Sequence, residues 1–425
     1  MSRTTRRAQL GATALVAMLA LTACSGSGSE PDAPAAEDGG EVAAEPATLS
    51  VWVMGDSGSN LEEAIKPFTE ETGIEVEVEA IPWDNVNDRL TTAIASGEGP
   101  DVTQIGLSQL ASFVEGGALE DIGDEIGDYP NLDPANFPAS VSPENLYPDG
   151  GTYSVPWVSD TRVLFYRSDI LAEAGVDAPP ATWDELRSTA KTLAERGEGQ
   201  YGYYIPQWDA PLPVAYAWQA GAEPIDDDGA IDLDTDGFRA AVDHYLGFYE
   251  DGSVPTAGDF DQATGFISGT APMLVSGPYL ANAIKEQAPD LEGKWGVTTV
   301  PANETSTSLF AGSNLGVWAG TENLDASLQL LDFLADPATQ AAWYEAVGEL
   351  PAATAAFEDA ALADDPLVAV YAEQLQDARP LPISTAWDAA SQAVLEALNA
   401  IALTGADKQQ TLEALNVAIE EINAR

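Results

Sequence analysis

The feature that most constrains the fold is a succession of strand-like and helix-like segments between residues 48 and 105. Thr48 to Val53 has the composition of a β-strand, Ile74 to Glu79 alternates strictly between apolar residues and Glu, and Pro100 to Ile105 returns to a β pattern. Between them, Leu61 to Phe68 and Val86 to Ile94 carry apolar residues at helical spacing. Repetition of strand, helix and strand predicts an α/β fold with a parallel sheet and helices on both of its faces.

The same alternation continues further along the chain. Strand-like composition returns in Ser154 to Tyr166 and in Gly202 to Ile205, helical patterns occupy Trp183 to Leu193 and Phe238 to Tyr249, and the stretch from about Asp325 onward is almost wholly helical. With 425 residues, 45% of them hydrophobic, the chain is long enough for at least two domains.

The first 24 residues have the three parts of an export signal. Three arginines within the first seven residues precede the apolar run Leu10 to Leu21, which is too short to span a bilayer as a stable helix. The run ends in Leu21-Thr-Ala-Cys24, which resembles the bacterial lipobox, whose Cys is acylated and becomes the new N-terminus. The alternative is an ordinary signal peptide with an accidental Cys, but Cys24 is the chain's single cysteine and stands at the required position.

Residues 25–47 consist mainly of Ser, Gly, Ala, Pro, Asp and Glu. This composition cannot bury a core, so we predict a disordered tether with an end-to-end distance of roughly 25–30 Å. Signal, Cys24 and tether together predict an exported protein, anchored by lipid to the cell membrane and facing the extracellular side.

The charge of the chain limits its partners. Seventy acidic residues stand against 16 basic ones, a net charge of −54, which repels nucleic acid, anionic lipid and anionic ligands at long range. A neutral ligand is therefore expected, although the charge is also compatible with a role in solubility alone. One cysteine and one histidine, His244, exclude a disulfide within the chain and zinc sites built on Cys and His, and we expect no cofactor.

Six short motifs, in a fixed order, carry a family resemblance. The motifs are Phe68 to Val76, Leu90 to Val102, Asp160 to Arg167 with Pro180 to Leu186, Phe266 to Pro278, Phe310 to Asn314, and Glu349 to Pro351. They resemble those of the family 1 extracellular solute-binding proteins, the sugar-binding components of ABC importers, a group that contains maltose-binding protein.

The resemblance covers residues 48–425 and implies a two-lobed, type II periplasmic-binding-protein-like fold. We expect lobe 1 to comprise residues 48–158 and 312–352, and lobe 2 residues 159–311 and 353–425, with a hinge between them and the ligand in the interlobe cleft. It also implies a monomer that captures a neutral sugar, expected to be a di- or oligosaccharide, and delivers it to ABC permease subunits served by a separate ATPase. On this basis the protein is not an enzyme.

A sugar presents hydroxyls and patches of C–H, so its site needs flat apolar faces and fixed polar groups. The resemblance implies such faces at Trp387, which precedes a helical segment, and at Tyr279, directly after Ser276-Gly-Pro278. Trp208 and Asp209 pair a flat face with an acceptor on an expected loop. The alternatives are a core position for Trp387 and surface or hinge packing for Trp208.

Further candidates lie near the expected turns and lobe crossings. The resemblance places a carboxylate at Asp160 and a polar contact at Asn314, with Trp157 close by and equally suited to the core. It also matches Asp56, in the first strand–helix turn, to a sugar-binding Asp, although Asp there serves equally well as a helix N-cap.

Two further motifs resemble other kinds of site, and three other functions remain as alternatives. Gly55-Asp-Ser-Gly58 resembles the nucleophile motif of chymotrypsin-like proteases, but no His precedes it to act as the base. Asp232 to Gly237, with Asp243 at position 12, resembles half of a calcium loop, although Asp234 or Thr235 also suits a helix N-cap. A glycosidase with two carboxylates roughly 5–10 Å apart, a binding protein for a non-sugar neutral solute, and an adhesion lipoprotein remain as alternative functions.

Overall fold

The computed structural model describes residues 47–82, 85–139, 141–142, 147, 150–225, 230–257, 260–381 and 385–424. The predicted signal peptide, Cys24 and residues 25–46 of the predicted tether lie outside these ranges. Within them, no helix is both long enough and apolar enough to cross a bilayer.

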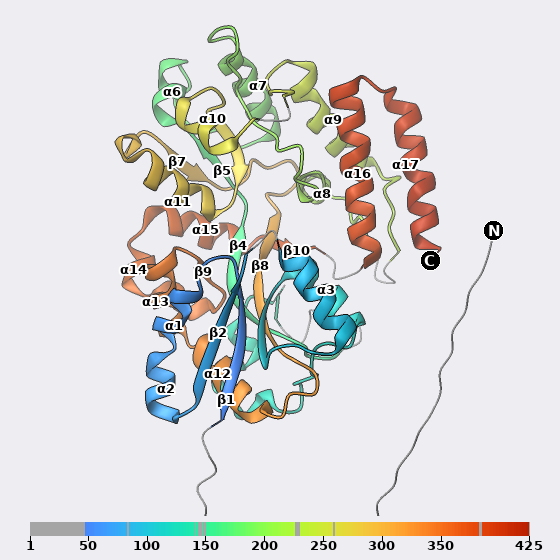
Figure 1. Ribbon diagram of the computed structural model, residues 1–425. Coiled ribbons are helices and arrows are strands. Elements are labelled where there is room, and N and C mark those ends of the chain that lie inside the picture. Colours follow the sequence, from blue (N-terminus) through green and yellow to red (C-terminus); the bar gives the residue numbers. More distant parts are fainter. Residues whose placement is uncertain are drawn as a thin grey trace, which may run out of the picture. The chain divides into compact units, whose positions relative to one another are not determined.

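A seven-stranded sheet, the larger of two sheets, forms the centre of one half of the fold (Figure 1). Its strand order is β2-β1-β3-β8-β4-β9, with β10 paired to β8. The strands are β1 (Thr48–Met54), β2 (Glu75–Ile81), β3 (Val102–Gly106), β4 (Val155–Thr161), β8 (Ser308–Val317), β9 (Leu350–Pro351) and β10 (Ala378–Pro380).

The sheet is mixed, so the prediction of a parallel sheet is correct only in part. β1 is parallel to β2 and β3, and β10 is parallel to β8, but β8 runs antiparallel to β3 and β4, and β4 antiparallel to β9. The sequence alternation predicted β1 to β3. Strand β8 joins this sheet from about 200 residues further along the chain, and local sequence patterns cannot predict such a pairing.

A smaller, three-stranded antiparallel sheet has the order β6-β5-β7. Its strands are β5 (Val163–Tyr166), β6 (Met273–Ser276) and β7 (Gly296–Thr298). The run Ser154 to Tyr166, predicted as one strand, is divided between β4 and β5 in two different sheets, with Arg162 alone between them. The strand predicted at Gly202 to Ile205 is reduced to a single bridge between Tyr204 and Leu274.

Helices cover both sheets, and those predicted by apolar spacing form where expected. In α7, for example, Thr182 caps the N-terminus by accepting a hydrogen bond from the Glu185 N–H, and Leu186, Ala190 and Leu193 are buried on one face. The α-helices are α1 (Gly58–Ala64), α2 (Lys66–Thr72), α3 (Val86–Ser96), α4 (Leu110–Glu115), α6 (Ser168–Glu173), α7 (Trp183–Ala194), α8 (Pro211–Gln219), α9 (Asp236–Glu250), α10 (Gln262–Ser268), α11 (Pro278–Gln287), α12 (Leu324–Ala335), α13 (Pro337–Val347), α14 (Ala360–Ala363), α15 (Pro366–Leu375), α16 (Thr385–Thr404) and α17 (Lys408–Asn423).

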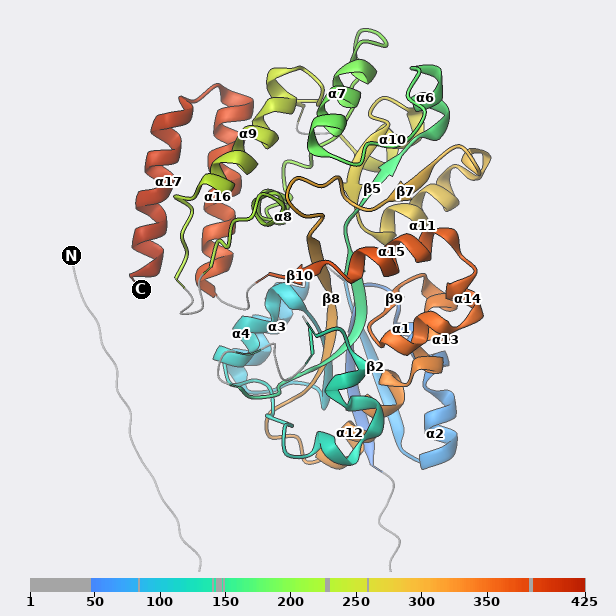
Figure 2. The ribbon, with the colours of Figure 1, turned by 180° about the vertical axis from the view of Figure 1, so that it is seen from behind.

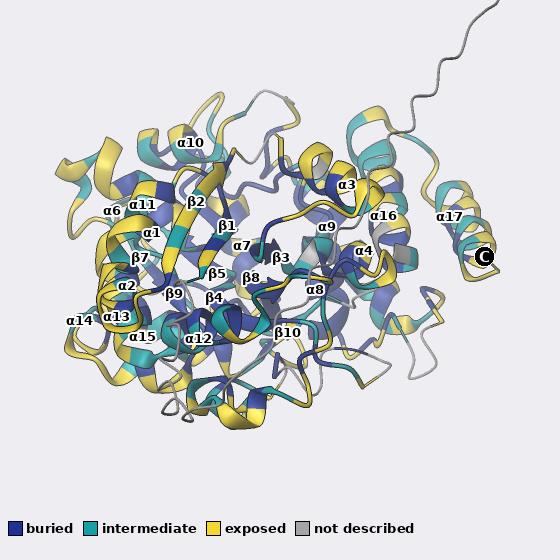
Figure 3. Cartoon of the chain, turned by 60° about the horizontal axis from the view of Figure 1, so that its bottom comes forward, coloured by how far each residue is buried: buried dark blue, intermediate teal, exposed yellow. Residues whose placement is uncertain are grey.

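Two large hydrophobic clusters lie under the two sheets. One contains Val51 and Val102 of the larger sheet together with Leu331 of α12, and the other contains Leu164 of the smaller sheet and Tyr245 of α9. The helical pair α16 and α17 packs beside α8 and α9 and belongs to the second cluster (Figure 2). Exposed residues follow the outer faces of the helices and the edge strand β2 (Figure 3). Each sheet thus has a core of its own.

The calcium-like segment is a helix start. Thr235 accepts a hydrogen bond from the Phe238 N–H at 3.1 Å and caps α9, which confirms the N-cap interpretation. Arg239 pairs with Asp234 and Asp236 and occupies two of the carboxylates that a cation would need. Among the described residues, no group of three or more Asp, Glu, His or Cys side chains is arranged to hold a metal.

Candidate ligand-binding cleft

A cleft of about 600 Å³ lies between the larger sheet and helix α11. One wall is formed by the turn after β1 and by strands β3, β4 and β8, and the other by one face of α11. Its lining residues include Asp56, Ser57, Gln104, Val158, Ser159, Asp160, Tyr279, Asn282, Glu286, Gln287, Gly312, Ser313 and Glu349. The cleft lining extends from Asp56 to Leu350, which are 294 positions apart in the chain. It includes three of the predicted site residues, Asp56, Asp160 and Tyr279.

Gln104 fixes the centre of the sheet wall. Its Oε1 accepts a hydrogen bond from the Met54 N–H at 2.7 Å, and its Nε2 donates to the Ser313 Oγ at 2.7 Å. Because both ends of the amide are engaged, β1, β3 and β8 are tied together where they border the cleft. The wall is thus a rigid polar surface prepared before any ligand arrives.

Asp160, near the end of β4, carries unused hydrogen-bonding capacity. Its Oδ1 is buried and has no hydrogen-bond partner. Burial raises the pKa of the Asp160 carboxyl above its usual value of 3.8; nearby Arg162 opposes that shift and Asp209 adds to it. Asp160 also lines the cleft, so its carboxylate combines an oxygen without a hydrogen-bond partner with a position in the cleft wall.

Glu349 and Asp56 add carboxylates to the same cleft. The Trp343 Nε1–H donates to Glu349 Oε2 at 2.8 Å, while burial raises the pKa of Glu349, and the charges of Asp160 and Asp56 raise it further. Asp56 itself is exposed. The N-cap of α1 is Ser57 rather than Asp56, so the capping alternative for Asp56 is wrong.

Tyr279 supplies an aromatic face. Among the described lining residues it alone is aromatic, and its side chain is 41% exposed. Its hydroxyl is held by the Arg162 Nη1 at 3.1 Å, the Gln262 Nε2 at 3.2 Å and the Ser276 Oγ at 3.0 Å. This anchoring limits the motion of the ring and so lowers the entropy cost of stacking a ligand on it.

Two of the predicted tryptophans are core residues in this conformation. Trp387 is 2% exposed and belongs to the cluster under the smaller sheet. Trp157 is also 2% exposed, and its ring centroid lies 5.1 Å from that of Trp343. The structure therefore places both rings in the core, which was the alternative for each. That either ring contacts the ligand stays a prediction.

The remaining predicted residues also lie outside the lining of the cleft. Asn314 is buried, and its Nδ2 donates to Ser154 Oγ at 2.8 Å, because its side chain points to the face of β8 opposite that of Ser313. Asp209 is buried next to Arg162. Trp208 is 58% exposed on the loop before α8. Their roles in binding likewise stay predictions.

Sequence reasoning missed Gln104, Glu349 and Arg162. Glu349 stands inside a motif that carried the family resemblance, and Arg162 follows Asp160 by two residues, at the same-face spacing of a strand. Both signals were therefore present in the sequence. Gln104 gave no local signal, because its importance depends on β8 pairing with β3.

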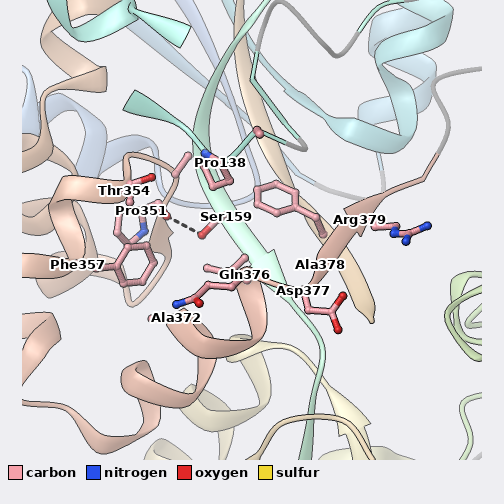
Figure 4. A pocket seen from close by; sticks show the side chains of 14 residues that line it. Pro138, Ser159, Pro351, Thr354, Phe357, Ala372, Gln376, Asp377, Ala378 and Arg379 are labelled. Atoms are coloured by element: carbon pink, nitrogen blue, oxygen red, sulfur yellow. Dashed lines mark hydrogen bonds between the residues drawn. The ribbon is translucent and has the colours of Figure 1, made fainter. Parts of the chain in front are cut away.

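A second cavity, of about 690 Å³, borders the same strands and is here named the rear pocket. It is lined by Pro138, Ala139, Ser159, Phe310, Pro351, Ala352, Thr354, Phe357, Ala372, Leu375, Gln376, Asp377, Ala378 and Arg379 (Figure 4). Ser159 borders both cavities, and its hydroxyl lies on the side of the rear pocket, where it donates to the Pro351 carbonyl at 2.6 Å. The rear pocket is mainly apolar and contains none of the predicted site residues.

Comparison with known proteins agrees with this architecture. Residues 52–341 match the family model described as "Bacterial extracellular solute-binding protein". The chain belongs to this family. The structure of the sugar-binding protein MalE from Xanthomonas citri superposes on this solute-binding protein with a TM-score of 0.82 at 28% identity, covering 89% of this chain and 97% of that one. The two-lobed fold with a hinge, expected from the sequence, is thereby confirmed.

Sequence relatives of this solute-binding protein include two characterised binders. It is 28% identical over 408 residues to the maltooligosaccharide ABC transporter solute-binding lipoprotein of Streptococcus pneumoniae, covering 91% of each chain. It is 29% identical over 351 residues to the diacetylchitobiose binding protein DasA of Streptomyces coelicolor, covering 79% of each. These similarities extend over most of the described fold.

Proposed function

We propose that this solute-binding protein captures a neutral sugar, of di- or oligosaccharide size, and delivers it to the permease of an ABC importer. The observation that carries the proposal is the cleft itself. It combines an anchored aromatic face, Tyr279, with the fixed amide of Gln104 and the carboxylates of Asp56, Asp160 and Glu349, the groups by which proteins bind sugar rings and hydroxyls.

The charge of the cleft supports a ligand without negative charge. Among its described lining residues are four carboxylates and no Lys, Arg or His. An anionic ligand would be repelled by these groups in a partly desolvated space. A sugar hydroxyl instead donates a hydrogen bond to each carboxylate and offsets the cost of desolvating it.

The relatives support the same ligand class and the same cellular role. The Streptococcus pneumoniae protein is named as a maltooligosaccharide-binding lipoprotein of an ABC transporter, and the Streptomyces coelicolor protein as a diacetylchitobiose binder. We further propose that this chain is acylated on Cys24, works as a monomer, and docks on its permease after the lobes close around the ligand. It performs no chemistry on the sugar.

The test is tryptophan fluorescence and thermal shift of residues 25–425 against neutral mono-, di- and oligosaccharides. A saturable response to one class, with the sugar recovered intact, is the expected result. Scattering should show compaction when that sugar binds, because hinge closure brings the lobes together; no compaction would contradict the closure mechanism. Cleaved sugar would favour a glycosidase, and no response across the panel would contradict the sugar assignment.

A further inference from the structure

Arg162 occupies a singular position, as the one residue that separates β4 in the larger sheet from β5 in the smaller one. Its carbonyl accepts a hydrogen bond at 2.7 Å from the hydroxyl of Ser308, the first residue of β8. The backbone of Arg162 is therefore attached to both strands that border the cleft and the rear pocket. The position of the Arg162 backbone, from which its side chain extends, is therefore fixed by these strands.

The guanidinium of Arg162 lies beside two cleft residues. Its Nη1 donates to the Tyr279 hydroxyl at 3.1 Å, and its Cζ lies 5.4 Å from the centroid of the Tyr279 ring. A Cβ placed on Gly277 would lie 2.6 Å from Asp160 Oδ1 and 3.1 Å from Arg162 Nη1. The carboxylate and the guanidinium therefore border the same point, the backbone that begins α11, and a side chain at position 277 would displace them.

The hydrogen bonding of this group is incomplete. Both Arg162 Nε and Asp160 Oδ1 are buried without a hydrogen-bond partner. Buried charged groups normally have such partners, because desolvation without compensation is costly. The arrangement leaves one oxygen of a carboxylate that lines the cleft without a partner, and a guanidinium lies close to the same point of the backbone.

The charges around Arg162 agree with a role in keeping Asp160 ionised. Burial raises the pKa of both Asp160 and Asp209, and Arg162 opposes the shift in each. Burial alone would lower the pKa of Arg162, but Asp160, Asp209 and Tyr279 together raise it above the usual value. The charge of Asp160 also raises the pKa of Glu349 before β9 and of Tyr371 on α15. The charge of Asp209 raises the pKa of four further tyrosines, Tyr203, Tyr204, Tyr216 and Tyr245.

We propose that Arg162 is the positioning residue of the sugar site: it fixes the Tyr279 ring for stacking and holds Asp160 as an anionic acceptor. It acts through these two residues and does not itself line the cleft. The proposal rests on the proposed function, because both residues are assigned there to the ligand.

The test compares Arg162→Gln, Arg162→Lys and the unchanged protein in calorimetric titrations over a pH series, using the sugar found in the panel. Gln removes the charge behind Asp160 and the bond to Tyr279, so we expect affinity to fall about 10- to 100-fold. Lys should restore part of it. In Arg162→Gln the pKa of Asp160 rises further, so the loss of affinity on acidification should begin at a higher pH, and adding Asp160→Asn should remove that pH shift.

Arg167→Gln is the matched control. Arg167 is a buried arginine that follows β5 and pairs with Asp169 and with carbonyls of α10, away from the cleft lining. The Arg167→Gln substitution should lower the melting temperature but leave the pH dependence of sugar binding unchanged. If Arg162→Gln binds with unchanged affinity, the proposed role of Arg162 is refuted while the proposed function stands. The same holds if affinity falls but the pH profile of binding does not shift and Arg162→Lys restores none of the affinity. An unchanged protein that binds no carbohydrate would refute the proposed function and this proposal with it.

Discussion

The cleft and the rear pocket are similar in volume, about 600 and 690 Å³, and border the same strands, yet they differ in what they leave unpaired. In the rear pocket, Asp377 accepts hydrogen bonds from Thr307 and Ser306, and Arg379 extends away from the cavity to pair with Glu223 (Figure 4). In the cleft, Asp160 Oδ1 has no partner. The two cavities therefore differ in the hydrogen bonding of their carboxylates and not in their volume.

The largest expected effect concerns a residue that borders neither cavity. Trp387→Ala should lower the free energy of unfolding by about 3–5 kcal/mol, because it empties a position in the core, while the folded fraction binds sugar normally. Denaturant unfolding and titration of the same sample separate the two quantities. A weakening of binding by about 1–3 kcal/mol would instead show that the ligand-bound form exposes this ring to the cleft.

Asp160→Asn should weaken sugar binding by about 10- to 100-fold, because it replaces an anionic acceptor by a neutral one of the same size. The matched control is Asp377→Asn, in the rear pocket, for which we expect unchanged affinity. Calorimetric titration of both variants measures the difference. Equal losses in the two variants would abolish the distinction between the cavities.

Tyr279→Ala should weaken binding by about tenfold through the loss of a stacking face. Tyr279→Phe keeps the face and loses only the hydroxyl bonds, so its effect should be smaller. Phe357→Leu, in the rear pocket, serves as the control for removal of an aromatic ring and should leave the titration unchanged. If Phe and Ala at position 279 weaken binding equally, the hydroxyl and not the ring face carries the contact.

Acidification should have opposite effects on binding and on the stability of the free protein. Burial raises the pKa of Asp160 and Glu349 above their usual values of 3.8 and 4.5, so the folded state binds these protons more tightly than the unfolded chain. Their contribution to the free energy of unfolding therefore grows as pH falls through the raised pKa values and is complete below the usual ones. Over the same interval the ligand loses its anionic acceptors.

The measurement is a pH series of melting temperature and dissociation constant for the unchanged protein and for Asp160→Asn with Glu349→Gln. The paired substitution should remove both trends. A pH dependence that persists in it would place the responsible groups outside the cleft.

The smallest expected effect is a gain in affinity of less than about threefold for Ala372→Leu. A larger side chain in the rear pocket should favour conformations in which that pocket is wide. The predicted lobe boundaries place the hinge in β4 and β8, and bending there would narrow the cleft as the rear pocket widens. Ala369→Leu, on the exposed face of the same helix α15, is the control. A weaker affinity in Ala372→Leu than in Ala369→Leu would show that the two cavities do not change in opposite directions.

Local sequence patterns predicted elements whose apolar residues recur at strand or helix spacing within the element itself, including β1, α3, β3, α7 and α9. They could not predict that β8 returns antiparallel between β3 and β4, because strand orientation depends on distant connections. The family motifs led to Asp56, Asp160 and Tyr279, which line the cleft, and their part in binding stays a prediction. Gln104 could not be singled out, because its position depends on the pairing of β8 with β3. Trp208, on an expected loop, is exposed, whereas Trp387, expected just before a helix, lies inside α16 and is buried. Local sequence does not distinguish the two outcomes, because a tryptophan outside a clear periodic pattern can be exposed or buried.

The single-residue junction between β4 and β5 has an evolutionary consequence. Side chains alternate along a strand, so one inserted or deleted residue at position 162 would move every inward-facing side chain of β5 to the other face of its sheet. Loops such as the one around Trp208 can change length without this penalty. Among homologous chains, gains and losses of residues should therefore accumulate in such loops, while the distance in sequence from Asp160 to Val163 stays constant.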